Sequence, residues 1–148
     1  GSGLFSLSSA ESNAISVGLG SDVGGGTSLS MLSNMNDAYK ILRLRSEEFS
    51  PLKAFYLATL GGAEVLDLDH TIGNFEPGKE ADFVVLDRSA TPLIEFRLGK
   101  SESLIEDLFV FSILGDDRVV KQTWSAGAKV HDRDIDIGID SSVEFLGI

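Results

Sequence analysis

The sequence of 148 residues contains no cysteine, which excludes disulfide bridges, thiolate metal sites and cysteine nucleophiles from this chain. Histidine is also scarce: the sequence has two, His70 and His131. They lie far apart and form neither an H-x-H nor an H-x-x-x-H pair, so they are weak candidates for metal ligands. We expect both to lie at the surface.

Basic residues are also few, with 12 Lys and Arg against 23 Asp and Glu and a net charge of −11. This balance argues against a phosphate backbone as ligand, so nucleic acid is not an expected partner. Apolar runs stay well below the roughly 20 residues of a membrane span, so no membrane is expected. Residues 1–25 lack a signal-peptide pattern, and Gly1-Ser2 is either a tag remnant or native sequence.

Apolar and small residues alternate over residues 14–20, which predicts a strand with Ile15, Val17 and Leu19 on one face. Three consecutive glycines at 24–26 predict a loop directly after it. A strand followed by a loop and a helical pattern indicates one βα unit.

Two helices are predicted next. The first is capped by Thr27 or Ser28 and extends to about Arg45, with apolar residues at three- and four-residue steps. The second begins at Ser50, which a proline follows at the first helical position, and the glycine pair that starts at Gly61 is expected to end it.

The second half has a different pattern, in which short strands surround a helix. Residues 82–87 form an apolar strand, and a helix capped by Ser101 ends just before Gly115. Strands over 119–124 and 128–131 follow, with a turn between them.

Asp22 is the strongest candidate for chemistry, because it closes the predicted strand and opens the glycine-rich loop. In barrels of parallel strands, catalytic groups gather at the carboxyl ends of the strands. A carboxylate there can bind a metal ion and exchange a proton with its water. The other interpretation of Asp22 is that it caps the following turn or helix. For the three glycines, two interpretations remain open: their amides bind an anion, or they serve tight loop geometry.

Several stretches are informative together: VGLGSDVGGGTSLSML at 17–32, ATLGGAEVL at 58–66, IGNFEPGKEADFVVLD at 72–87, LGDDR at 114–118 and WSAG at 124–127. The stretches at 58–66 and 72–87 resemble the part of the amidohydrolase superfamily where a barrel ends and the chain returns to a small β-domain. The first stretch, which carries Asp22, resembles the last-strand metal motif of the guanine deaminases in that superfamily, and the stretch at 114–118 is similar to the guanine deaminase C-terminus.

The resemblance implies an α/β chain from the C-terminal end of a metal-dependent hydrolase (β/α)8 barrel plus part of the small β-sandwich domain. Residues 1–68 would be the last βα unit and closing helices of the barrel. Residues 69–131 would be the C-terminal part of the small β-domain with an inserted helix. Residues 132–148 would be a tail, either an edge strand or partly disordered.

The resemblance also implies the chemistry. In a zinc-dependent guanine deaminase, Asp22 would be one zinc ligand and would move a proton from the attacking water to departing ammonia, leaving xanthine. The family's histidine ligands and base-recognition residues have no counterpart here, so we expect the chain alone to be inactive. Guanine is the expected substrate and zinc the cofactor, in a cytoplasmic homodimer.

Two other functions stay open. One is a deaminase of the same superfamily that acts on another purine-like heterocycle. The other is a non-catalytic fragment that associates with copies of itself, because a barrel strand without its neighbours leaves unpaired edges and exposed apolar surface.

Overall fold

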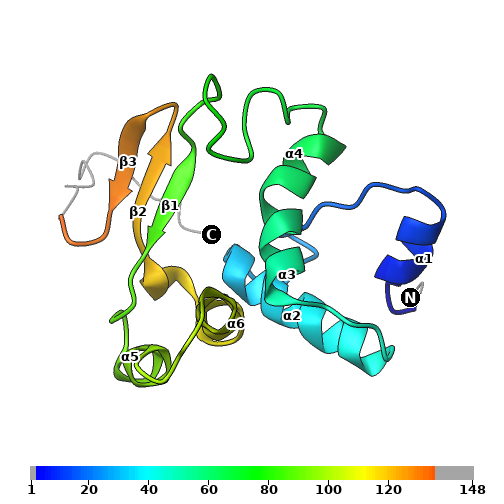
Figure 1. The fold of residues 1–148 in the computed structure, drawn as a ribbon, viewed down its shortest axis with the longest axis horizontal. Helices are drawn as coiled ribbons and strands as arrows, with labels where there is room; N and C mark the ends of the chain where they lie inside the picture. The colour runs from blue at the N-terminus through cyan, green and yellow to red at the C-terminus, as the bar shows by residue number, and fades with distance from the viewer. Residues whose placement is uncertain (1–2, 136–148) are drawn as a thin grey trace, which may run out of the picture.

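The computed structural model describes residues 3–135. Four helices lie beside a three-stranded sheet, and two further helices lie at one end of that sheet (Figure 1). The elements are α1 (Leu7–Ser12), α2 (Met31–Leu44), α3 (Pro51–Ala58), α4 (Leu60–Val65), β1 (Phe83–Leu86), α5 (Pro92–Leu98), α6 (Leu104–Leu114), a 3-10 turn η1 (Asp117–Val119), β2 (Val120–Ser125) and β3 (Ala128–Asp132).

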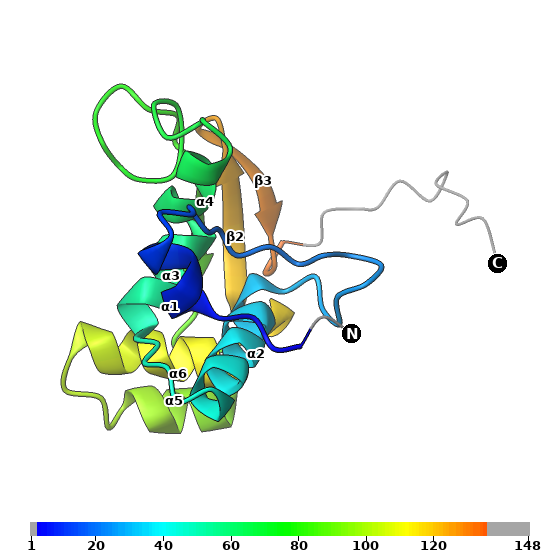
Figure 2. The same cartoon turned by 90° about the vertical axis from the view of Figure 1, so that its right-hand side faces the viewer.

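The predicted strand over residues 14–20 is wrong. This segment lies outside regular secondary structure, and its Leu19 amide donates to the carbonyl oxygen of Leu57 in α3 at 2.8 Å. A strand needs a neighbouring strand to complete its hydrogen bonds. Within residues 3–135 the one sheet is β1-β2-β3, so the segment has no strand beside it. It runs past the helices before the chain loops outward (Figure 2).

Helix α2 begins later than expected, with Ser30 as its cap in place of Thr27 or Ser28. The Ser30 hydroxyl accepts a hydrogen bond from the Ser33 amide at 3.5 Å. The Ser28 hydroxyl accepts from the Ser30 amide at 3.0 Å instead. This local turn competes with a helical start at Ser28, and it moves the first helical turn toward Met31.

Helix α3 confirms the Ser50 cap, whose hydroxyl accepts from the Lys53 amide at 3.1 Å. The predicted end at Gly61 is wrong, because the helix breaks at Thr59 and Gly61 lies inside α4. Thr59 has φ −127° and ψ −101°, and its hydroxyl donates to the Phe55 carbonyl at 2.7 Å. Gly61 permits close packing, since a Cβ there would lie 2.9 Å from the Tyr56 ring.

The sheet confirms the predicted strands. Both pairs are antiparallel, and Phe83 on β1 pairs with Trp124 on β2, where their rings stack at 5.5 Å. Ala126 and Gly127 join β2 to β3 with φ of 48° and 76°, the two positive values of a tight hairpin turn. The predicted tail begins with the end of β3, and residues 136–148 lie outside the described residues.

Two helices lie between β1 and β2. The predicted one is α6, which ends before Gly115 as expected but is capped by Ser103 in place of Ser101. Helix α5 was not predicted, although Thr91 caps it and proline follows at its first position. That is the same signal that identified α3.

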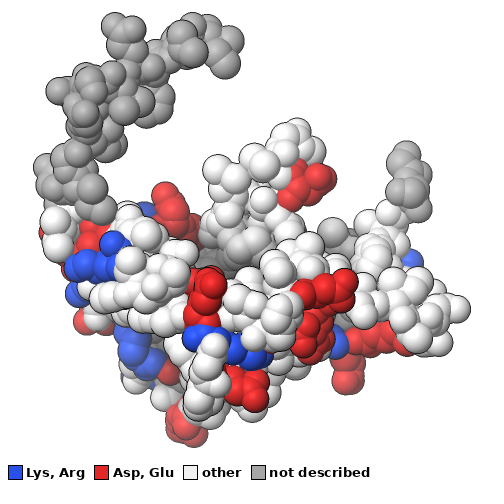
Figure 3. All heavy atoms as spheres, turned by 90° about the horizontal axis from the view of Figure 1, so that it is seen from above, with Lys and Arg blue, Asp and Glu red and all other residues white. Residues whose placement is uncertain are grey.

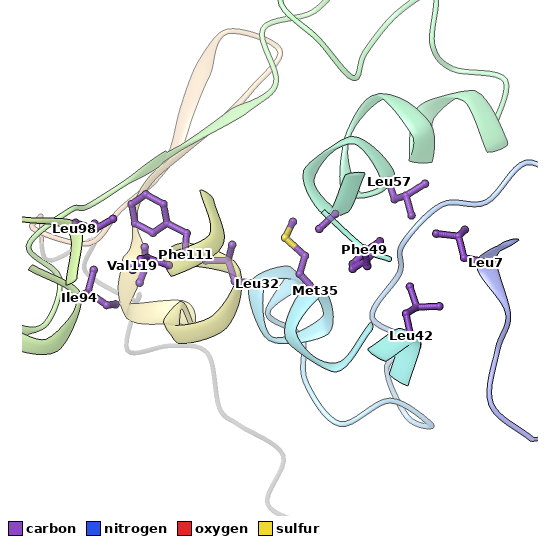
Figure 4. Close-up of a cluster of buried hydrophobic side chains, with 12 residues drawn as sticks. Leu7, Leu32, Met35, Leu42, Phe49, Leu57, Ile94, Leu98, Phe111 and Val119 are labelled. Atoms are coloured by element: carbon purple, nitrogen blue, oxygen red, sulfur yellow. The ribbon is translucent and has the colours of Figure 1, made fainter. Parts of the chain in front are cut away.

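One buried apolar cluster joins the helices to the sheet side of the molecule (Figure 4). Leu7, Leu42 and Leu57 lie at one end of it, Met35 and Phe49 between, and Leu32, Ile94, Leu98, Phe111 and Val119 at the other. Helix α2 supplies members along the length of the cluster, so this helix connects the two parts.

Candidate functional site

Asp22 lies where the segment before α2 turns sharply. Its φ is +48°, a left-handed conformation that Asp tolerates better than most residues. Its carbonyl oxygen accepts hydrogen bonds from the amides of Gly25 and Gly26 at 2.9 and 2.5 Å. A Cβ on Gly26 would lie 1.9 Å from the Ser21 carbonyl oxygen, so the glycines serve tight loop geometry.

The carboxylate of Asp22 is free for a ligand. The residue is exposed, and among residues 3–135 its side chain has no hydrogen-bond or ion-pair partner. It does not cap the following helix, because that cap is Ser30. Its Oδ2 atom would lie 2.8 Å from a Cβ on Gly25, so the carboxylate lies close over the loop.

A cavity of about 650 Å³ lies between this segment, α1 and α2. Its walls are mainly apolar, with Ser21, Asp22, Thr27, Asn34 and Asp37 as polar members. The Thr27 hydroxyl donates to the Asp37 carboxylate at 3.3 Å, which ties the far end of the glycine loop to α2. Asp22 therefore lies on the edge of an open, mostly apolar hollow.

The described residues do not form a complete metal site. No group of three or more His, Asp or Glu side chains within residues 3–135 is placed to hold a metal ion. His70 and His131 are exposed, as predicted, and neither joins Asp22 in such a group. A zinc site needs three or more protein ligands, so Asp22 fits a single ligand position.

The remaining charges form local pairs. Asp116 and Arg118 pair at 2.5 Å in the turn before β2, and the Arg118 guanidinium lowers the pKa of the Asp116 carboxyl. Lys and Arg atoms alternate with Asp and Glu atoms on the face in Figure 3, without the continuous basic surface that nucleic-acid binding requires. No helix in the described part of the chain is long and apolar enough to cross a membrane.

Residues 1–130 match the sequence model of the amidohydrolase family, so the chain belongs to this family. Within it, the chain is similar to guanine deaminases. It is 52% identical over 133 residues to the guanine deaminase of Escherichia coli. The aligned region covers 90% of this chain and 30% of that protein. The structure of the E. coli enzyme matches with a TM-score of 0.86. The predicted resemblance is confirmed.

Among the other solved structures that match the chain, two were determined with a ligand or metal ion bound. A guanine deaminase from C. acetobutylicum with guanine bound in its active site has a TM-score of 0.68 at 25% identity, over 88% of this chain and 30% of that one. An adenosine deaminase from Xanthomonas campestris with bound zinc has a TM-score of 0.54 at 27% identity, over 67% of this chain and 21% of that one. The chain spans about 30% of the length of the guanine deaminases it matches.

Proposed function

We propose that this chain is part of a zinc-dependent guanine deaminase and that Asp22 is its contribution to the metal site. The observation that carries the proposal is the 52% identity to a guanine deaminase over nearly the whole chain. The exposed carboxylate of Asp22, on the edge of an apolar hollow, supports the assignment of that residue. The other zinc ligands lie outside this chain.

Asp22 has two roles in the proposed reaction. Its carboxylate would help to hold zinc, and the bound ion would supply a Lewis acid that lowers the pKa of water to about 7. The carboxylate also takes a proton from the attacking water and delivers it to the departing amino group. Guanine and water thereby give xanthine and ammonia, with no other co-reactant.

The same family membership also suggests where this chain lies in the fold of the complete enzyme. The chain is α/β, and we propose that residues 1–68 close a (β/α)8 barrel whose other strands lie elsewhere in the protein. In that setting residues 14–20 would have strands on both sides. We further propose that residues 69–131 belong to a small β-domain, and that the complete enzyme is a cytoplasmic homodimer.

A deaminase of another purine is the second candidate, because the adenosine deaminase from Xanthomonas campestris also matches. Its match covers 67% of this chain, against 88% for the guanine deaminase with bound guanine and 89% for the E. coli enzyme. The longer matches favour guanine as substrate.

The test uses the complete protein from the source organism and its Asp22→Asn variant. Asparagine has the same shape and also tolerates a φ of +48°, so the variant removes the charge and keeps the turn. We expect zinc content to fall and kcat with guanine to drop by about 10²–10⁴. Asp69→Asn, at another exposed carboxylate, is the control and should leave both unchanged.

Three results would change the assignment. A zinc-loaded protein that ignores guanine and deaminates adenosine would keep the family and replace the substrate. Full activity in Asp22→Asn would remove the role of Asp22. A complete protein that neither binds zinc nor releases ammonia from a purine would overturn the proposed function.

A further inference from the structure

The backbone just before Asp22 is held against the junction of α3 and α4. The Leu19 amide donates to the Leu57 carbonyl oxygen at 2.8 Å. In a continuous helix that carbonyl would accept from the residue four positions on. Here the helix breaks at Thr59, and the break presents the Leu57 carbonyl to the segment.

Gly18 makes the closest contact of this segment. A Cβ on Gly18 would lie 3.0 Å from the Cα of Gly62 and 3.7 Å from a methyl carbon of Val65. The two glycine backbones therefore touch, and a side chain at position 18 would push the segment away from α4. Gly18 does not have a positive φ, so contact and not backbone conformation favours glycine here.

The residues on either side of Gly18 add to this attachment. Val17 and Leu19 pack against the buried core, and the glycine turn fixes the chain immediately after Asp22. The chain is thus attached on both sides of Asp22. Before it, Gly18 and Leu19 contact the α3–α4 junction, and after it the turn at 22–26 fixes the backbone. Among residues 3–135, the Asp22 carboxylate makes no hydrogen bond or ion pair that would set its position.

We propose that Gly18 is a positioning residue, whose close contact with Gly62 sets the place of the Asp22 carboxylate relative to the zinc ion. This role rests on the proposed function, in which Asp22 is a zinc ligand. Misplacing a ligand by a few tenths of an ångström weakens metal binding. Loss of a contact that supports a metal ligand typically lowers metal affinity by about 10–100-fold.

The test compares zinc affinity with stability in the complete protein. Zinc is titrated into the metal-free protein and its Gly18→Ala variant, and the Tm of each is measured without metal. We expect the variant to bind zinc about tenfold more weakly and to have a lower kcat for guanine at full zinc loading, with KM unchanged. Alanine is the smallest substitution available, and because Gly18 does not have a positive φ, its backbone conformation is open to alanine.

Two control variants separate position from stability. Ile94→Val thins the core at the end opposite Leu7 (Figure 4), and Gly99→Ala makes the same chemical change just after α5. Both should leave zinc affinity unchanged, even where Tm falls.

The outcomes are distinct for the two proposals. A protein that binds zinc and deaminates guanine, with Gly18→Ala indistinguishable from it in zinc affinity, overturns the positioning role alone. A loss of affinity that merely follows Tm, equally in Ile94→Val, overturns it as well. A complete protein that binds no zinc overturns the proposed function and, with it, this role.

Discussion

Glu47 shows how one side chain secures a wall of the candidate site. Its carboxylate accepts hydrogen bonds from the Ser6 hydroxyl at 2.8 Å, the Ser8 amide at 2.9 Å and the Arg45 guanidinium at 2.9 Å. Ser6 is the cap of α1, and α1 forms part of the cavity beside Asp22. One carboxylate therefore joins α1 to the loop between α2 and α3.

These contacts lower the pKa of Glu47 from 4.5 to about 2, with the Ser8 amide as the largest cause. A lowered pKa means that Glu47 stabilises the fold fully above about pH 4.5 and loses that effect as the pH falls through about 2. Glu47→Gln should therefore lower Tm at pH 7, and the difference from the unchanged chain should shrink below pH 4.5.

Thermal unfolding followed by circular dichroism between pH 2 and 7 measures this difference. Glu48→Gln is the matched control, because Glu48 is the exposed neighbour of Glu47 and has no hydrogen-bond partner among residues 3–135. A gap between Glu47→Gln and the unchanged chain that stays constant down to pH 2 would contradict the assigned role.

At the residue scale, the loop beside Asp22 was predictable from the sequence, because local chemistry decides its conformation. The glycines after Asp22 had to form a tight loop, and they do. The path of the backbone just before Asp22 did not follow, because it depends on contacts with Leu57 and Gly62, which come much later in the chain.

At the scale of the elements, the chain packs closely against α2 at Gly115, directly after α6. A Cβ there would lie 2.3 Å from the Phe111 carbonyl oxygen and 2.7 Å from a methyl carbon of Leu32. Gly115→Ala should therefore lower the free energy of unfolding by about 1–3 kcal/mol through overpacking. Gly99→Ala, also directly after a helix, should change it by less than about 1 kcal/mol. Urea unfolding of the three chains measures both effects.

The cap of α3 supports a second prediction at this scale. The Ser50 hydroxyl accepts from the Lys53 amide, which otherwise has no partner in the first helical turn. Ser50→Ala should cost about 1 kcal/mol of stability, and Ser50→Asp should restore it. Equal stability of Ser50→Ala and the unchanged chain would show that the cap adds nothing here.

Elements with a complete local signal were predictable, and the others required tertiary information. The Ser50-Pro51 pair and the Ala126-Gly127 turn fix their own backbone conformations. Thr91-Pro92 carries the same signal, a capping hydroxyl followed by proline, at the start of α5. The break at Thr59 had no comparable signal, and the strand over 14–20 failed because its pattern describes a strand that needs partners which residues 3–135 do not provide.

At the scale of the whole molecule, apolar surface is exposed on several elements. Leu29 and Phe75 are 74% and 80% exposed. A groove of about 720 Å³ between α2, α3 and the sheet is lined by Leu29, Val84 and other mainly apolar residues. Such a surface is unusual for a protein that acts alone, and it agrees with a chain that spans about 30% of its relatives' length.

The chain by itself should consequently associate, and the groove should contribute to that association. Sedimentation velocity at increasing concentration should show species larger than 15.8 kDa, and Leu29→Lys should shift them toward the monomer by placing a charge in the groove. Leu44→Lys is the control, since Leu44 is 76% exposed and does not line the groove. If both variants act alike, association comes from general apolar exposure, and a monomer at every concentration would show that the exposed surface does not drive it.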